Sequence, residues 1–178
     1  MLKPSFIALC MVALSPLVLS CSSTSYKEDI LCPTVRIEKA TASATYFKEG
    51  KSKGLIDKVF SVKIMGYKGT CSYDKDHPST VNMSINVEFE AELGAAATSR
   101  EQSAKYFVAI PEFYPAAFAK QVFPVRFAFP ERYDRIDYRD EEVNISIPIP
   151  EGKTATDYTV YIGMQLDKDM LKYNRTLK

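Results

Sequence analysis

The sequence predicts an all-β protein, an antiparallel β-sandwich or small barrel of seven to eight strands with a short C-terminal helix. Two observations support this class. Apolar and polar residues alternate along several segments, and these segments follow one another without intervening helical patterns. Residues 81–93 are the clearest case, with strict alternation over 13 positions. That pattern is typical of a strand with one buried and one solvent-facing side.

The other strands are expected from the same alternation. A long segment, 57–74, contains Gly66 and Gly69, so we expect a bulge or bend there and a short strand around Cys71. Pro124 indicates an edge position or a bulge, and Pro148 an edge position, because proline cannot donate a hydrogen bond to a neighbouring strand. The remaining expected strands cover residues 32–40, 104–110, 121–130, 143–150 and 157–166.

The C-terminal segment is the one clear helical signal. Asp167 is expected to cap a helix over the following residues, in which Met170, Leu171 and Asn174 recur at helical spacing. Residues 94–103 fit either a loop or a single helical turn.

The first 20 residues have the features of an export signal. Lys3 precedes a largely apolar segment, 6–19, and small polar residues follow it. Ser15-Pro16 interrupts this segment, which is shorter than the roughly 20 apolar residues that a membrane-spanning helix needs. A permanent transmembrane helix is therefore the weaker alternative.

The boundary Val18-Leu19-Ser20-Cys21 resembles the lipobox of bacterial lipoproteins. In that family the cysteine sulfur receives a diacylglyceryl group, and cleavage makes this cysteine the new N-terminus. The resemblance implies that Cys21 is the lipid attachment site and anchors the protein in a membrane. Ser22 after the cysteine implies transfer to the outer membrane, facing the periplasm. The alternative is that Cys21 is only the first cysteine of a soluble secreted domain.

Three segments are therefore expected: a signal peptide (1–20), a lipidated tether (21–31) and one domain (32–178). Cleavage before Cys21 leaves 22 basic and 22 acidic residues. This balance does not favour a nucleic-acid partner. A small basic cluster at 48–54 is expected to be a solvated loop.

Cys32 and Cys71 are expected to form a disulfide, since an oxidising compartment favours a bonded pair. The chain has one histidine, His77. Two sulfurs and one imidazole fall short of a four-ligand metal site, so we expect no metal and no cofactor. His77 lies among Asp74, Asp76 and Pro78, a composition typical of a turn.

The segment 147–163 resembles the strand–turn–strand of fibronectin-type and immunoglobulin-like domains. That resemblance implies an immunoglobulin-like sandwich with a tyrosine corner, in which the Tyr158 hydroxyl bonds to the backbone near 150–154. A plain hairpin with an alternating tyrosine is the alternative. No full strand follows Leu166, so the last strand of the usual topology is in doubt.

No catalytic arrangement is evident. The sequence has no G-x-S-x-G motif to present a nucleophile. The densest charged stretch, 132–142, contains carboxylates that could serve a glycosidase, but interleaved arginines favour an exposed loop or edge strand. We therefore expect that the protein is not an enzyme. An enzyme or inhibitor that works through a loop is a weak third alternative.

The segment 110–130 is the candidate interaction surface, because aromatic residues alternate there with prolines. Phe113, Tyr114 and Phe118 could line a groove for a partner. The alternative is that these rings fill the core.

The order of these features resembles a family of small uncharacterised bacterial lipoproteins with a β-rich domain. The resemblance implies an envelope location and supplies no catalytic residues. We expect a membrane-anchored, non-catalytic module that is structural or contacts an envelope protein. The alternative is a module that binds a sugar, a peptide or another envelope component through 110–130.

Overall fold

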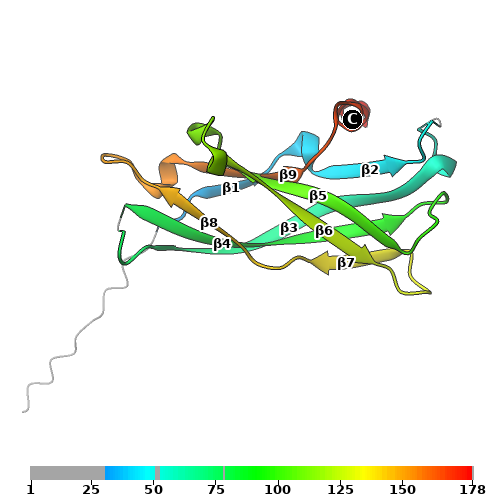
Figure 1. The fold of residues 1–178 in the computed structure, drawn as a ribbon, viewed down its shortest axis with the longest axis horizontal. Helices are drawn as coiled ribbons and strands as arrows, with labels where there is room; N and C mark the ends of the chain where they lie inside the picture. Colours follow the sequence, from blue (N-terminus) through cyan, green and yellow to red (C-terminus); the bar gives the residue numbers. More distant parts are fainter. Residues whose placement is uncertain (1–30, 51–52, 78, 178) are drawn as a thin grey trace, which may run out of the picture.

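The computed structural model describes residues 31–50, 53–77 and 79–177 (Figure 1). The expected signal peptide and Cys21 lie outside these residues. Over the described part the protein is mostly β, with nine strands in two sheets and a short C-terminal helix, α1 (Lys168–Thr176). The strands are β1 (Thr34–Ile37), β2 (Ser43–Phe47), β3 (Lys58–Tyr73), β4 (Thr80–Leu93), β5 (Glu101–Ala109), β6 (Lys120–Ala128), β7 (Arg135–Arg139), β8 (Val143–Pro148) and β9 (Thr159–Met164).

Four strands form one sheet in the order β1-β9-β5-β6, and the other sheet has the order β2-β3-β4-β7, with β8 also paired to β4. All pairings are antiparallel except β1 with β9, which is parallel. The expectation of a purely antiparallel structure was therefore wrong at this edge. The short β1 reaches β9 from the N-terminal side of the chain and runs in the same direction.

The hairpin of β3 and β4 is the longest element, with strands of 16 and 14 residues. The predicted bulge is confirmed, because the register of the pairing shifts between Ile64 and Gly66. The strand does not stop at Gly69 but continues to Tyr73, so the segment around Cys71 belongs to β3. The alternation of β4 is also confirmed: its apolar residues from Val81 to Ala91 are buried.

Nine strands replace the seven or eight expected. The sequence analysis did not predict β2. The charged stretch 132–142 contains β7, which lies at the end of its sheet, so the edge-strand interpretation of this stretch is confirmed. Pro124 lies in β6, the edge of the four-stranded sheet, and Pro148 is the last residue of β8. Residues 94–100 form turns and bends rather than a helical turn.

Side chains from both sheets contribute to one buried hydrophobic cluster. Phe89 of β4 makes edge contacts with Tyr106 of β5 and Phe127 of β6, with ring centroids 5.3 and 5.9 Å apart. Aromatic pairs in this geometry stabilise a core beyond the area that they bury. The inward side chains of the two sheets therefore pack against each other.

The predicted helix is confirmed, with its cap. The Asp167 carboxylate accepts a hydrogen bond from the Met170 N–H at 2.7 Å. Asn174 joins the helix to β2 and to the turn before it, since its amide nitrogen donates to the carbonyls of Ser43 and Ala40. No helix among the described residues is long and apolar enough to cross a bilayer.

Candidate functional site

The disulfide between Cys32 and Cys71 is formed, with the two Cα atoms 5.8 Å apart. It links the residue two positions before β1, in the four-stranded sheet, to β3 in the five-stranded sheet. A second contact lies close by, since the Tyr67 hydroxyl donates to the Val35 carbonyl. The chain therefore enters the domain at a fixed point, near the C-terminal end of β3.

The candidate interaction surface lies in the connection between β5 and β6, which contains two short 3-10 turns. Phe113 stacks on Tyr158, with centroids 4.9 Å apart, and contacts Phe118 at 5.2 Å. Phe113 is half-buried and packs against the core. Tyr114 and Phe118 reach the surface, with exposed fractions of 83% and 38%.

The three predicted residues therefore divide between core and surface. Tyr114 lines a shallow hollow of about 330 Å³ together with Pro111, Pro115 and Lys120. The Glu112 carboxylate accepts a hydrogen bond from the Thr159 N–H, and Thr159 pairs with Thr34 at the start of β1. This loop is thus at the end of the molecule where the chain enters the domain.

The predicted tyrosine-corner hydrogen bond is not formed among the described residues. The Tyr158 ring is buried and packs on Phe113, and its hydroxyl bonds to no backbone atom of 150–154. The turn is instead closed by Thr154 and Asp157, whose backbone and side-chain groups bond reciprocally. Because the Thr154 N–H donates to it, the Asp157 carboxylate has a lowered pKa.

The charged stretch around β7 is neutralised by its neighbour β4. Arg139 bonds Glu88 at 2.6 Å, and Arg135 bonds Glu92 at 3.2 Å. Lys58 also donates to Glu92, and this hydrogen bond is the main cause of the lowered pKa of that carboxyl. These carboxylates are therefore paired with cations on the same sheet.

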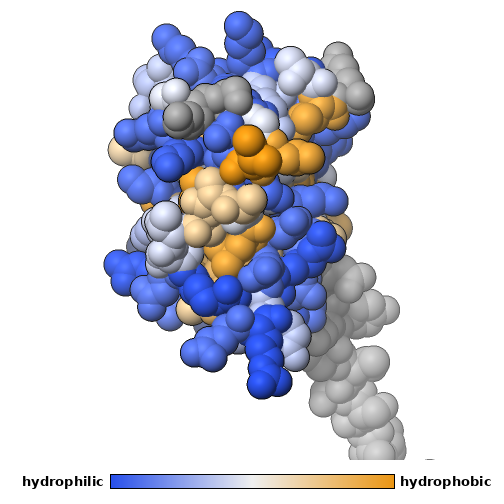
Figure 2. All heavy atoms as spheres, turned by 90° about the vertical axis from the view of Figure 1, so that its right-hand side faces the viewer, coloured by the Kyte–Doolittle hydropathy of each residue, from blue (hydrophilic) through white to orange (hydrophobic). Residues whose placement is uncertain are grey.

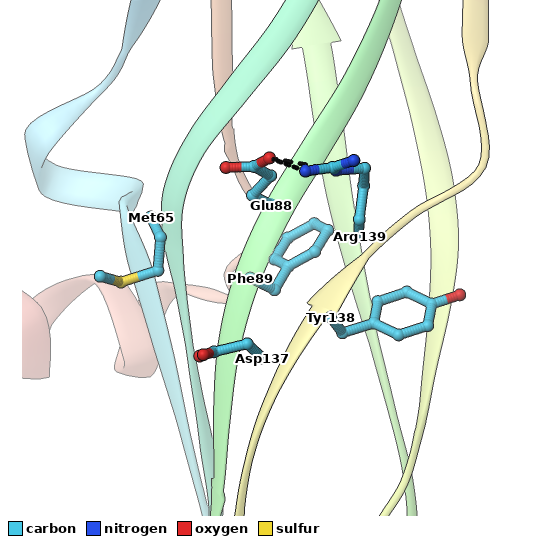
Figure 3. A pocket seen from close by; sticks show the side chains of 6 residues that line it. All are labelled: Met65, Glu88, Phe89, Asp137, Tyr138 and Arg139. Atoms are coloured by element: carbon cyan, nitrogen blue, oxygen red, sulfur yellow. Dashed lines mark hydrogen bonds and ion pairs between the residues drawn. The ribbon is translucent and has the colours of Figure 1, made fainter.

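A hollow of about 440 Å³ is lined by one of these ion pairs, Glu88 with Arg139 (Figure 3). Figure 3 shows the Arg139 side chain turned toward Glu88, with Met65 on the other side of Glu88 from Arg139. Its other lining residues are Phe89, Asp137 and Tyr138. The ionisable side chains among its lining residues are Glu88, Asp137, Tyr138 and Arg139.

Tyr106 forms a polar contact between the two sheets that the sequence did not predict. Its ring is fully buried, and its hydroxyl donates to the Asp140 carboxylate at 2.8 Å. Burial raises the pKa of Tyr106 strongly, and the neighbouring Asp140 charge raises it further. The partners are 34 residues apart, and no local pattern could indicate their contact.

His77 is exposed and lies in the predicted turn. The Asp74 carboxylate accepts hydrogen bonds from the Asp76 N–H, the Asn82 amide and the His77 N–H, and these bonds lower its pKa, the Asp76 bond most. This arrangement is an Asx turn, in which the side chain of Asp74 bonds to the backbone of the residues that follow it. Within the described ranges, no group of three or more His, Cys, Asp or Glu side chains could hold a metal ion.

The sequence analysis did not predict the exposed hydrophobic side chains at one end of the molecule. Figure 2 shows hydrophobic side chains gathered among polar ones at the end of the molecule opposite the disulfide. Leu55 and Ile56, in the turn before β3, have exposed fractions of 83% and 79%. Lys53 of the neighbouring basic cluster is not freely solvated, since it donates to the Asp169 carbonyl of α1.

Comparison of the chain with family models, curated proteins and solved structures finds no match in any of the three.

Proposed function

We propose that the protein is a lipid-anchored lipoprotein of the bacterial cell envelope whose domain is a non-catalytic structural or protein-interaction module. The observation that carries the proposal is the sequence Val18-Leu19-Ser20-Cys21, followed by a polar tether and a disulfide-closed domain. The disulfide supports export, because such bonds persist in oxidising compartments. Ser22 favours the outer membrane, with the domain in the periplasm.

We further propose that the two sheets form an immunoglobulin-like sandwich. The contacts of Phe89 with Tyr106 and Phe127 support face-to-face packing of the sheets. In immunoglobulin domains the last strand borders its predecessor in one sheet. Here the chain turns into α1 after β9, and β1 lies beside β9 at that position. The N-terminal strand thus takes the place of the missing last strand.

A non-catalytic role is supported by the way in which charged side chains are used. The carboxylates of β4 are held in ion pairs with β7 and Lys58. Asp74 and Asp157 close turns through backbone N–H groups. Each of these acids is bonded to a group of the protein itself. Such a bond has a structural role, whereas a catalytic acid contacts a substrate.

Metabolic labelling with an alkyne-bearing fatty acid tests the anchor. The wild type should incorporate the label and sediment with membranes, whereas Cys21→Ser should incorporate none. Cys10→Ser is the matched control, because it changes a cysteine of the expected signal peptide and should leave labelling intact. An unlabelled wild-type protein would refute the proposal.

The alternative, a ligand-binding module, is favoured by one observation: Tyr114 is exposed beside a proline-lined hollow. An exposed aromatic ring in such a place can stack on a sugar or a peptide. Calorimetric titration of soluble envelope oligosaccharides and peptides should then show binding that Tyr114→Ala abolishes. Tyr133→Ala, at another exposed tyrosine, should leave the binding unchanged, and equal binding by all three proteins would exclude this site.

A further inference from the structure

The outer face of the four-stranded sheet carries a set of exposed cations. Along β5, Ala104, Tyr106 and Val108 are buried, so the alternate residues face outward. The same alternation applies to β1 and β6. The exposed cations on this face are Arg36, Lys105, Lys120 and Arg126.

None of these four cations forms an ion pair with another described residue; the ion pairs present involve other side chains. Glu101 is the one acidic residue of β5 on this side; it lies diagonally across from Arg126 and lines the same hollow. Two further acids lie at the margin, and both are bonded to backbone N–H groups: Glu38 to Ala40 and Glu112 to Thr159. The four cations therefore outnumber the three acids on and beside this face.

Apolar side chains lie between these cations. The Lys120 amine is 4.6 Å from the centroid of the Phe107 ring, and Val122, directly opposite Phe107, is 45% exposed. A Cβ atom at Gly163 would come within 2.7 Å of the Phe107 ring, so the glycine lets the ring lie close to the sheet. Lys120 also lines the hollow beside Tyr114. Cations with tyrosine and aliphatic side chains beside them are typical of surfaces that contact a membrane interface.

We propose that this face binds the anionic lipid headgroups of the membrane that carries the anchor. The inference rests on the proposed function, because the tether brings the face to the bilayer. The tether enters the domain at Cys32, just before β1, and β1 is the edge strand of this same sheet. Residues 22–31 can span up to about 35 Å when extended. This length is enough for the outer face of the four-stranded sheet to lie against the bilayer.

The expected affinity explains why the anchor is needed. Each cation close to an anionic membrane strengthens attachment about fivefold, so four correspond to a dissociation constant in the millimolar range. A short flexible tether supplies an effective concentration of the same order. The tethered domain should therefore rest on an anionic bilayer much of the time, and the free domain should not.

The test uses the mature chain coupled through the Cys21 thiol to a maleimide lipid in vesicles. Cys32 and Cys71 are bonded to each other, so Cys21 is the free thiol. Vesicles are made of phosphatidylcholine alone or with phosphatidylglycerol. Acetylation by a water-soluble ester is followed by peptide mass spectrometry at Lys105 and Lys120. Lys63 and Lys68, exposed on the five-stranded sheet, are internal controls.

Anionic vesicles should slow acetylation of Lys105 and Lys120 severalfold relative to neutral vesicles and leave Lys63 and Lys68 unchanged. The protection should disappear in about 1 M salt, where the screening length is about 3 Å. Arg36→Gln with Arg126→Gln should weaken it, and the matched control Arg135→Gln with Arg139→Gln should not.

The inference would be overturned if anionic vesicles, relative to neutral ones, slowed acetylation of Lys105 and Lys120 no more than acetylation of Lys63 and Lys68. Protection by free polyaspartate, without protection by anionic vesicles, would also overturn it and assign the face to an acidic macromolecule. Because the coupling is chemical, these results are independent of whether Cys21 is acylated in cells.

Discussion

The outer faces of the two sheets handle charge in opposite ways. On the five-stranded sheet, the glutamates of β4 are met by arginines of β7 and by Lys58. On the four-stranded sheet, four cations lie among apolar side chains, and none of them forms an ion pair with a described residue. A nearly neutral chain, with a formal net charge of +1, can thus carry one neutralised face and one basic face. Net charge alone does not reveal a binding surface.

The largest effect is expected where the two sheets are joined covalently. Replacing Cys32 and Cys71 together by serine should lower the free energy of unfolding by about 4 kcal/mol, because the unfolded chain gains the freedom of a long loop. Denaturant titration measures this loss, and wild type in reductant should reproduce it. A change below about 1 kcal/mol would mean that the sheets hold β1 without the cross-link.

Replacing one glycine on each sheet by alanine tests how closely other side chains pack over the outer faces of the two sheets. Gly163→Ala should destabilise by about 1–3 kcal/mol, because its Cβ would meet Phe107 and the Thr41 hydroxyl. Gly66→Ala is the matched substitution on the five-stranded sheet, where the nearest atom would be a Glu88 oxygen at 3.7 Å. We expect a shift there within about 0.5 kcal/mol. Equal thermal shifts for both variants would contradict the close packing of Phe107.

The hydrogen bond between Tyr106 and Asp140 is a polar link between the two sheets at a buried tyrosine. Tyr106→Phe should cost about 1.5–3 kcal/mol, the range for a hydrogen bond to a charged group. The folded-state pKa of Tyr106 is raised above its unfolded value of about 10. Its contribution is therefore full below pH 10 and is lost as the pH rises above 10, where only the unfolded chain releases the proton.

Denaturation at pH 8 to 11 measures this dependence. Wild type should lose more stability above pH 10 than Tyr106→Phe, and Tyr133→Phe, at an exposed position, should behave as wild type. Parallel pH profiles for wild type and Tyr106→Phe would show that the hydroxyl is not buried.

The smallest effects are expected from single charges on the two faces. Arg139→Gln should cost less than about 1 kcal/mol, because its pair with Glu88 is partly exposed, and high salt should reduce the cost. Lys105→Gln should leave stability unchanged, since Lys105 has no acidic partner. Thermal melts at low and high salt distinguish the two, and a loss in Lys105→Gln as large as in Arg139→Gln would indicate a missed interaction.

The sequence predicted the strands whose buried and exposed sides differ strongly. The strand β4 is the clearest example, because every second residue is apolar. The strand β2 was missed because its five residues are mostly half-buried and its alternation is weak. In β7, only Ile136 and Tyr138 carry the pattern, and arginine and aspartate between them also fit a loop.

The candidate surfaces were harder to predict, since they depend on pairing between distant segments. Phe113 and Tyr114 are neighbours, yet one stacks on Tyr158 and the other faces solvent. A loop has no period that could separate them. The basic face appears only after β1, β5 and β6 are placed in one sheet, because its cations lie up to 90 residues apart in the chain.

The central claim is that Cys21 carries the lipid that holds this domain at a membrane. The mass of the N-terminal peptide of the mature protein, isolated from membranes, tests it most directly. The account predicts a chain that begins at Cys21 and carries a diacylglyceryl group on its sulfur. A mature chain with an unmodified Cys21, or one that begins at another residue, would contradict it.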